Sequence, residues 1–155
     1  MHGDTGFLRH SSPEGGRDTV GYGHKLTQKN EVENNIYGID LDDLTIEDAE
    51  RILTVDVGKC SRTLSRALQR KFGIGIEDLS NRKQMMLLDF EYNLGSAVKV
   101  FPSFTGAVIA GDRTRQEAEY KRSFVDRAGV RQPLARNAAF YSTFMTYEAI
   151  GLLGE

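Results

Sequence analysis

The sequence has little of three features that would place it in a specialised class of protein. It contains a single cysteine, Cys60, which cannot form an internal disulfide, so its stability must come from packing. We interpret Cys60 as a small buried apolar residue of a helix. No apolar run approaches the length of a membrane span. Residues 1–4 do not begin a signal peptide, because no basic region precedes an apolar one, so export would need another route.

The charge is nearly balanced as well. The 155 residues include 20 basic and 22 acidic side chains, which gives a net charge of -2. This balance lacks the electrostatic footprint of a nucleic-acid-binding protein, so we expect no nucleic-acid partner. With 39% hydrophobic and 27% charged residues, the chain fits one folded domain, or one domain with two lobes around a cleft.

The first 24 residues are rich in glycine and polar residues. Residues 7–10 fit the end of a short helix, with Pro13 as a stop and a glycine turn after it. The run from Thr19 to His24 is β-branched and aromatic, which predicts a strand. It is the only convincing strand in the sequence.

Everything after residue 24 is predicted to be helical. Thr45, with Asp48 three residues later, predicts the capped start of a long helix with one buried stripe and a charged outer face. Ser80 is the predicted cap of a second helix, which is apolar on most sides and ends at Gly95. Shorter helices are expected over residues 103–110, 114–124 and 135–153.

Four segments carry a resemblance to a known family. They are Asp18-Thr19-Val20-Gly21-Tyr22-Gly23-His24-Lys25-Leu26-Thr27, Leu44–Glu50 followed by Asp56-Val57, Met85–Gly95 ending Tyr92-Asn93-Leu94-Gly95, and Gly129–Phe140. The first resembles the signature hairpin of phage-type lysozymes, and the others follow in the family's order at comparable spacing. The resemblance covers nearly the whole chain.

The resemblance implies an α+β, mainly α, lysozyme-like fold in a single domain over residues 1–155. A small N-terminal lobe with a short β-hairpin would span about residues 1–45. A connecting helix would span about residues 45–66, and a helical C-terminal lobe about residues 67–155.

The resemblance also implies a muramidase, which hydrolyses the β-1,4 bond between N-acetylmuramic acid and N-acetylglucosamine without a cofactor. Such hydrolysis needs a protonated acid at the leaving oxygen and a carboxylate or positioned water on the other side of the sugar. The family's acid is a glutamate at the end of the first helix, so the candidate here is Glu14, with Asp4 as a weaker alternative. The family's water is held by an aspartate and a threonine of the hairpin, which nominates Asp18 and Thr19.

Two departures from the family keep other interpretations open. Only four residues separate Glu14 from Thr19, where the family has most of a hairpin, so Glu14 is alternatively a solvated loop carboxylate. Asp18 directly precedes Thr19, and adjacent strand residues point to opposite faces. One alternative is therefore a lytic transglycosylase, which needs the acid but no water. The other is a non-catalytic peptidoglycan-binding or virion structural module.

The histidines are interpreted as structural. Strand alternation places His24 on the face opposite Thr19, and the resemblance pairs it with Asp56, so we predict a structural ion pair. The letters of a hydrolytic triad also occur, in His10, Ser11, Ser12 and Asp18, but no nucleophile-elbow pattern supports them. Three scattered histidines and one cysteine give no metal-ligand spacing, and no metal is expected.

A glycan groove needs aromatic platforms and hydrogen-bond donors. The resemblance implies that substrate-binding residues would be Tyr92, Asn93, Phe101, Ser103 and Arg136. Core packing is the alternative for the two aromatic residues, and a solvated helix charge is the alternative for Arg136.

The expected partner is the glycan strand of peptidoglycan, with no nucleic acid and no membrane span. We expect a monomer, or a domain of a larger virion protein. The expected setting is a bacteriophage endolysin, a virion lysozyme domain or a related bacteriocin domain. It would be made in the host cytoplasm and act on the cell wall after holin-type release or as part of a virion.

Overall fold

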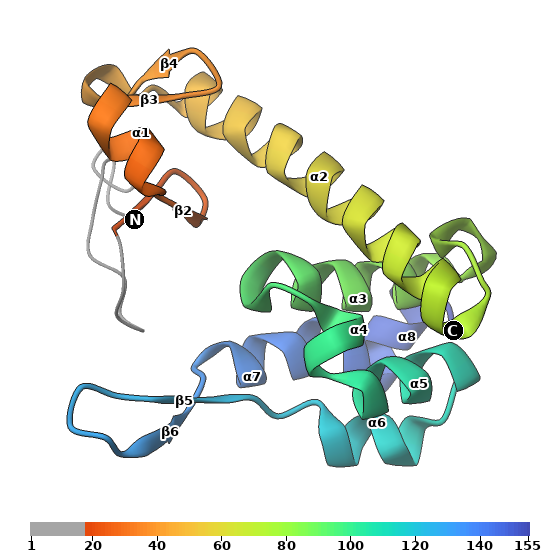
Figure 1. Ribbon diagram of the computed structural model, residues 1–155. Helices are drawn as coiled ribbons and strands as arrows, with labels where there is room; N and C mark the ends of the chain where they lie inside the picture. The colour runs from red at the N-terminus through yellow and green to blue at the C-terminus, as the bar shows by residue number, and fades with distance from the viewer. Residues whose placement is uncertain (1–17) are drawn as a thin grey trace. The chain divides into compact units, whose positions relative to one another are not determined.

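A computed structural model describes residues 18–155 (Figure 1). The chain divides into two compact units, Met1–Gly58 (unit 1) and Lys59–Glu155 (unit 2). The described part is mainly helical with short two-stranded sheets, which confirms the expected mainly α, α+β class. The predictions for residues 7–16 lie outside the described residues.

In unit 1, the described residues form mostly short elements around a small apolar core. Its elements are β1 (Thr19–Val20), β2 (His24–Lys25), α1 (Gln28–Glu33), β3 (Asn35–Ile36), β4 (Ile39–Asp40), η2 (Leu41–Asp43) and the first part of α2 (Ile46–Phe72). The core is formed by Val20, Leu26, Ile36, Ile39, Leu41, Leu44 and Ile52.

The β-structure of unit 1 differs from the prediction. The expected continuous strand over residues 19–24 is wrong, because Gly21 and Gly23 take positive φ values and turn the chain between β1 and β2. The expectation that no other strand occurs is also wrong. Tyr37 and Gly38 both have positive φ, at 53° and 85°, which a tight two-residue hairpin loop requires, and they join β3 to β4.

The long helix α2 begins as predicted. Thr45 Oγ1 accepts from the Asp48 N–H at 3.1 Å, and the Thr45 N–H donates to Asp48 Oδ2 at 3.2 Å, so both halves of a capping box are present. The helix continues to Phe72, six residues beyond the expected end at 66. Gly73, with φ +70°, follows it.

The expected single buried stripe on α2 is wrong. In the first half, Ala49 and Ile52 are buried, whereas in the second half Leu64 and Leu68 are buried. Ile52 and Leu64 are twelve residues apart, which rotates their side chains by about 120° around an α-helix. Each half of α2 therefore buries a different face.

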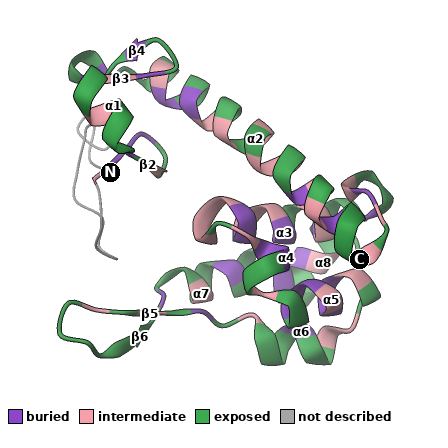
Figure 2. Ribbon diagram, in the orientation of Figure 1, coloured by how far each residue is buried: buried purple, intermediate pink, exposed green. Residues whose placement is uncertain are grey.

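Unit 2 contains the second half of α2 and the remaining elements. These are η3 (Ile76–Asp78), α3 (Asn81–Leu94), α4 (Ala97–Val100), α5 (Pro102–Ala110), α6 (Arg113–Glu119), β5 (Ser123–Val125), β6 (Arg131–Pro133), α7 (Arg136–Phe140), the π-helical η4 (Tyr141–Met145) and α8 (Tyr147–Leu153). Figure 2 shows buried positions along α3 and α5.

The core of unit 2 is built around Phe90 of α3. Its ring stacks on Phe104 with centroids 4.1 Å apart and meets the edges of Phe101 and Phe140 at 5.2 and 5.1 Å. The predicted start and end of this helix are confirmed. Ser80 Oγ accepts from a first-turn N–H, and Gly95, with φ +99°, ends the helix.

The helix expected over residues 103–110 is observed as α5, but the next predicted helix is shorter than expected. The helix expected over residues 114–124 ends at Glu119, because residues 123–125 pair with residues 131–133 in an antiparallel hairpin. Asp126 closes this hairpin by accepting the N–H groups of Ala128 and Val130 at 3.0 and 2.9 Å. These bonds, led by that from Val130, lower the pKa of Asp126.

The helix expected over residues 135–153 is interrupted. After α7 the chain widens into η4, and Thr146 then takes an extended conformation and caps α8 through its side chain. Thr146 therefore starts a new helix inside the expected one. Within residues 18–155, no helix is both long and apolar enough to cross a membrane.

The capping box of α2 gives a first test. Replacing Thr45 with Ala removes the acceptor for the Asp48 N–H, and we expect the free energy of unfolding to fall by about 1 kcal/mol. Chemical denaturation monitored by circular dichroism measures the change. Thr63→Ala, an exposed position inside the same helix, should leave stability unchanged or slightly higher. Equal losses in both variants would contradict the capping role.

Candidate active site

The β1–β2 hairpin carries Thr19, the residue nominated to position water. Thr19 pairs with Lys25, Val20 pairs with His24, and the Leu26 N–H donates to the Asp18 carbonyl at 2.9 Å. The Thr19 side chain is buried. A Cβ added at Gly21 would lie 3.5 Å from the Ala49 Cβ, so the turn between the strands approaches the first turns of α2 closely.

The register orders the side chains of the hairpin as strand alternation predicts. Directly opposed residues of an antiparallel pair point to the same face, so His24 lies on the face of Val20 and Thr19 lies on the other. Asp18 is half-buried at the start of the hairpin. The catalytic roles of Thr19 and Asp18 remain predictions.

His24 contacts Asp56 of α2, as the resemblance implies. His24 Nδ1 lies 2.7 Å from Asp56 Oδ2, and the Tyr37 hydroxyl donates to Asp56 Oδ1 at 2.6 Å. The His24 and Tyr37 rings meet edge to face with centroids 5.8 Å apart. One carboxylate therefore accepts hydrogen bonds from two hairpins, which ties both to the same helix.

The surroundings of His24 favour a structural role over a role as a base. Its side chain is 14% exposed, and within residues 18–155 its Nε2 atom is enclosed and finds no hydrogen-bond partner. Because Nδ1 faces the carboxylate, Nε2 is the only nitrogen left to take a proton from a substrate or water. An enclosed Nε2 is poorly placed for that transfer.

Glu14, the candidate acid, lies outside the described residues. The same is true of Asp4, the weaker alternative, and of His10, Ser11 and Ser12. In the sequence, four residues separate Glu14 from Thr19.

The five residues nominated for substrate binding all belong to unit 2. Tyr92 and Asn93 lie near the end of α3 and are half-buried, and Phe101 packs edge-on against Phe90. Ser103 is exposed near the start of α5, where its carbonyl accepts from Arg115 at 3.4 Å. Arg136 is exposed at the first residue of α7. Core packing thus accounts for part of the Phe101 surface, whereas Arg136 is open to solvent.

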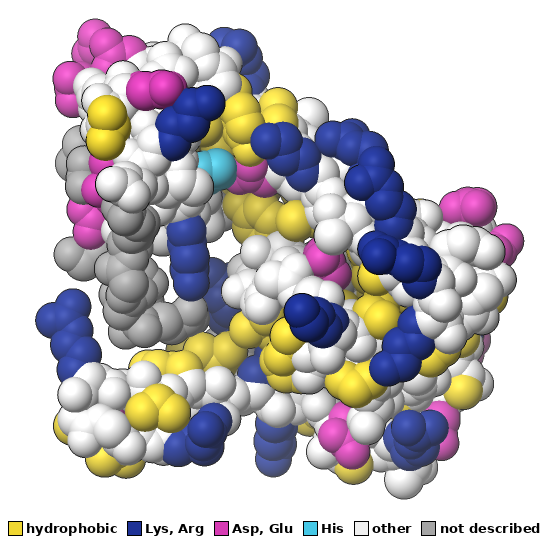
Figure 3. All heavy atoms as spheres, viewed as in Figure 1, with side chains coloured by type: hydrophobic (Ala, Val, Ile, Leu, Met, Phe, Trp, Pro, Cys, Tyr) yellow, Lys and Arg dark blue, Asp and Glu magenta, His cyan; other side chains and the backbone are white. Residues whose placement is uncertain are grey.

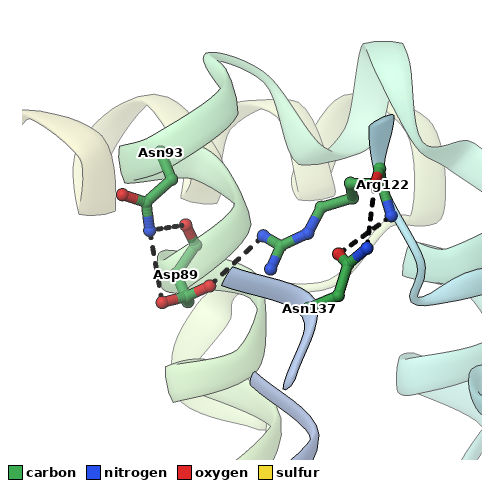
Figure 4. Close-up of polar contacts among 4 residues, drawn as sticks. All are labelled: Asp89, Asn93, Arg122 and Asn137. Atoms are coloured by element: carbon green, nitrogen blue, oxygen red, sulfur yellow. Dashed lines mark hydrogen bonds and ion pairs between the residues drawn. The ribbon is translucent and has the colours of Figure 1, made fainter. Parts of the chain in front are cut away.

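Asn93 belongs to a polar cluster that the sequence analysis did not identify (Figure 4). Its amide donates to the Asp89 carbonyl at 2.9 Å and to Asp89 Oδ1 at 3.2 Å. The other Asp89 oxygen lies 3.4 Å from Arg122 Nη1. Asp89 therefore orients the Asn93 amide and the Arg122 guanidinium together.

Arg122 is the buried member of this cluster. Its side chain is 1% exposed, and its guanidinium lies 4.4 Å from the Phe90 ring centroid and 5.0 Å from that of Phe140. Asn137 accepts from the Arg122 N–H at 3.0 Å and donates to its carbonyl at 2.9 Å. This two-point contact joins the base of the β5–β6 hairpin to α7, next to Arg136.

The sequence contains one signal for this cluster. Asp89 and Asn93 interrupt the mostly apolar run over residues 85–94 at i, i+4 spacing, so they lie on one face. Arg122 gives no such signal, because it follows a short helix and precedes an unexpected strand. Its contact with Asp89 spans 33 residues.

Glu91, next to Tyr92, is a second buried ionisable group. Its side chain accepts the Ala97 N–H at 3.0 Å at the start of α4. Burial raises the pKa of Glu91 above its ordinary value, and the hydrogen bond from Ala97 opposes this change in part. The protonated form of this carboxyl is therefore more favoured in the folded protein than in the unfolded chain.

No protein-family model matches the chain, and no curated protein matches it. Over residues 18–155 there is also no group of three or more histidine, cysteine or acidic side chains arranged to hold a metal ion. The family resemblance therefore rests on the residues of the hairpin, α2, α3 and the C-terminal segment alone.

The shared acceptor in unit 1 gives a second test. Asp56→Ala removes the partner of both His24 and Tyr37, and we expect the free energy of unfolding to fall by about 2–3 kcal/mol. Tyr37→Phe removes one of the two bonds and should cost about 1 kcal/mol. Glu50→Ala is the control for loss of a helix carboxylate, and stability should change little. A loss in Asp56→Ala no larger than in Glu50→Ala would contradict the shared role.

The buried carboxyl of Glu91 gives a third test. Because its folded pKa lies above its unfolded value, the contribution of Glu91 to stability is greatest below the unfolded pKa and is lost as pH rises through the folded pKa. Glu91→Gln keeps an acceptor for the Ala97 N–H and removes the charge, so it should be more stable than the wild type at pH 7. The gain should shrink at pH 4, as denaturation at both pH values will show. Glu117→Gln, on the exposed face of α6, should show no such pH-dependent gain.

Proposed function

We propose that this protein is a lysozyme-like muramidase that hydrolyses the β-1,4 bond between N-acetylmuramic acid and N-acetylglucosamine in peptidoglycan. The observation that carries the proposal is the 2.7 Å contact between His24 and Asp56. The resemblance to phage-type lysozymes predicts this contact across 32 residues, between a hairpin and a long helix. No local sequence pattern specifies it, so its presence supports the likeness.

The proposed chemistry divides between an acid and a positioned water. Glu14 protonates the glycosidic oxygen as the bond breaks, and a water molecule held by Thr19 attacks the anomeric carbon. Asp18 is proposed to assist Thr19 and to accept the proton released by the water. His24 takes no part in proton transfer and instead fixes the hairpin to α2 through Asp56.

Unit 2 supplies the proposed glycan contacts. Tyr92 and Phe101 would offer ring surface to a sugar, and Asn93, Ser103 and Arg136 would offer polar groups. Of these, Asn93 has the best-defined geometry, because Asp89 fixes its amide in two places. Arg136 is suited to a carboxylate, since its planar guanidinium can donate two parallel hydrogen bonds.

A lytic transglycosylase acts on the same bond and remains the second candidate. The observation that favours it is the position of Asp18, directly before Thr19 in the hairpin, because a transglycosylase does not need a carboxylate to hold water. The biological setting proposed for either enzyme is a phage endolysin, a virion lysozyme domain or a bacteriocin domain.

Turbidity clearing of purified peptidoglycan tests the proposal. The wild type should clear the suspension, and Glu14→Gln should clear it at least about 100-fold more slowly, because an amide cannot donate the proton that the leaving oxygen needs. Glu33→Gln, which removes an exposed carboxylate from α1, is the matched control and should clear at the wild-type rate.

The possible outcomes separate the candidates. Clearing by Glu14→Gln at the wild-type rate would remove Glu14 from the mechanism. Clearing by neither protein would favour the non-catalytic binding module. Mass spectrometry of the released products separates the two enzymes, because a transglycosylase gives an anhydro product that is lighter by one water.

A further inference from the structure

The second half of α2 has an unusual charge composition. Residues 59–72 contain five of the chain's 20 basic residues and none of its 22 acidic residues. Residues 46–58 of the same helix contain four acidic residues and one basic residue. Figure 3 shows lysine and arginine side chains in a run along α2. The basic segment lies wholly within unit 2.

Three arginines of this segment form a row, which we call the basic row: Arg62, Arg66 and Arg70. They recur every four residues, so they lie on one helix face about 6 Å apart along the axis. All three are exposed, and the face opposite them holds Leu64 and Leu68, which are fully buried. The basic row therefore points away from the core of unit 2.

Within the part of the chain that the structure describes, the guanidinium groups of the basic row have no acidic partner. Among residues 18–155, none of them takes part in an ion pair, and their one hydrogen bond is a 3.5 Å contact from Arg70 Nε to the Arg66 carbonyl. Like charges at i, i+4 spacing destabilise a helix by roughly 0.2–0.5 kcal/mol per pair. The row therefore reduces the stability of the helix that carries it.

Helix electrostatics account for only part of the row. Cations near a helix C-terminus interact favourably with the helix dipole, but the effect falls off within the last turn. Arg70 lies in that turn of α2, whereas Arg66 and Arg62 lie six and ten residues before Phe72. The helix dipole thus gives no reason for the two earlier arginines, and an anionic ligand would.

The character of the row limits the chemistry of that ligand. Between Arg62 and Arg70 the exposed neighbours of the arginines, Thr63 and Gln69, are polar, so this stretch of the face offers no apolar side chain to enter a lipid bilayer. The rest of the chain carries all of the acidic residues, which repel a dense polyanion such as duplex DNA. Separate carboxylates on an extended polymer fit the row better, because the planar guanidinium of each arginine can donate two parallel hydrogen bonds to one carboxylate.

We propose that the basic row binds the carboxylates of the peptide stems on a peptidoglycan strand. This inference rests on the proposed muramidase function, because that function brings the strand to the protein. The row would hold the wall polymer to unit 2 by contacts separate from those at the cleaved bond. These contacts are between charges in water, so they should weaken as salt is added.

Co-sedimentation with purified insoluble peptidoglycan on ice, before clearing begins, tests this inference. The variant R62Q/R66Q/R70Q should bind about ten-fold more weakly than the wild type at low salt, and the difference should vanish at high salt. Glutamine keeps a high helix propensity, so the variant should stay folded, as circular dichroism will check. The matched control K99Q/K121Q/R127Q removes three exposed charges elsewhere in unit 2 and should bind within two-fold of the wild type.

A second arm identifies the ligand. Peptidoglycan whose carboxylates have been amidated should bind the wild type as weakly as the variant binds untreated material. Equal binding by the wild type and R62Q/R66Q/R70Q, equal losses in both triple variants, or unchanged binding to amidated peptidoglycan would overturn the inference. Tighter binding of the wild type to duplex DNA than to peptidoglycan would also overturn it.

The two proposals fail in different ways. If sedimentation depends on the basic row but no clearing occurs, the muramidase proposal is contradicted and the binding of peptidoglycan by the row is still supported. Normal clearing, together with equal sedimentation of the wild type and R62Q/R66Q/R70Q, would support the muramidase and overturn the inference.

Discussion

The structure depends on one helix that supplies apolar side chains to two separate cores. Ile52 of α2 belongs to the core of unit 1, and Leu64 and Leu68 belong to the core of unit 2. Because the two groups project from different sides of the helix, a single apolar stripe along α2 could not contribute to both cores. The capping box at Thr45 sets where this helix begins.

Unit 2 combines this apolar packing with buried charges. Arg82 of α3 is almost fully buried, and its guanidinium donates to the Phe144 carbonyl, to Gln116 and to the Glu155 carbonyl. Arg122 lies against two aromatic rings and contacts Asp89. Removing the partner of a buried charge is costly, so these arginines restrict how α3, the β5–β6 hairpin and the C-terminal helices can pack together. In particular, the contacts of Arg122 with Asp89 and Asn137 connect α3, which carries Asn93, to the start of α7, which carries Arg136.

Features fixed by neighbouring residues were predictable from the sequence. The caps at Thr45 and Ser80 and the stop at Gly95 each depend on hydrogen bonds within one turn, and all three were found as expected. The β5–β6 hairpin was not expected, because its signal is a single side chain, that of Asp126, which accepts the N–H groups of its own turn. The break at Thr146 was also missed, because the residues on both sides of it are apolar enough to predict one continuous helix.

The contacts of the candidate site join residues far apart in the sequence, so local patterns could not predict them. The contact of His24 with Asp56 was predictable only through the family resemblance, which supplies long-range information that a single sequence lacks. The contact of Arg122 with Asp89 had no such source. An arginine that becomes buried by stacking on rings from two other helices looks, in sequence, like any solvated arginine.

The charge pattern of α2 also makes the helix a large electric dipole. The backbone contributes about half a positive charge at the N-terminus and half a negative charge at the C-terminus. The side chains oppose the backbone dipole, with a net three negative charges in residues 46–58 and five positive charges in residues 59–72. Because these charges are larger, they determine the direction of the total dipole of the helix. The helix is about 40 Å long, and an anionic surface would draw one end towards itself and push the other away. Approach to such a surface would therefore be oriented before any contact forms.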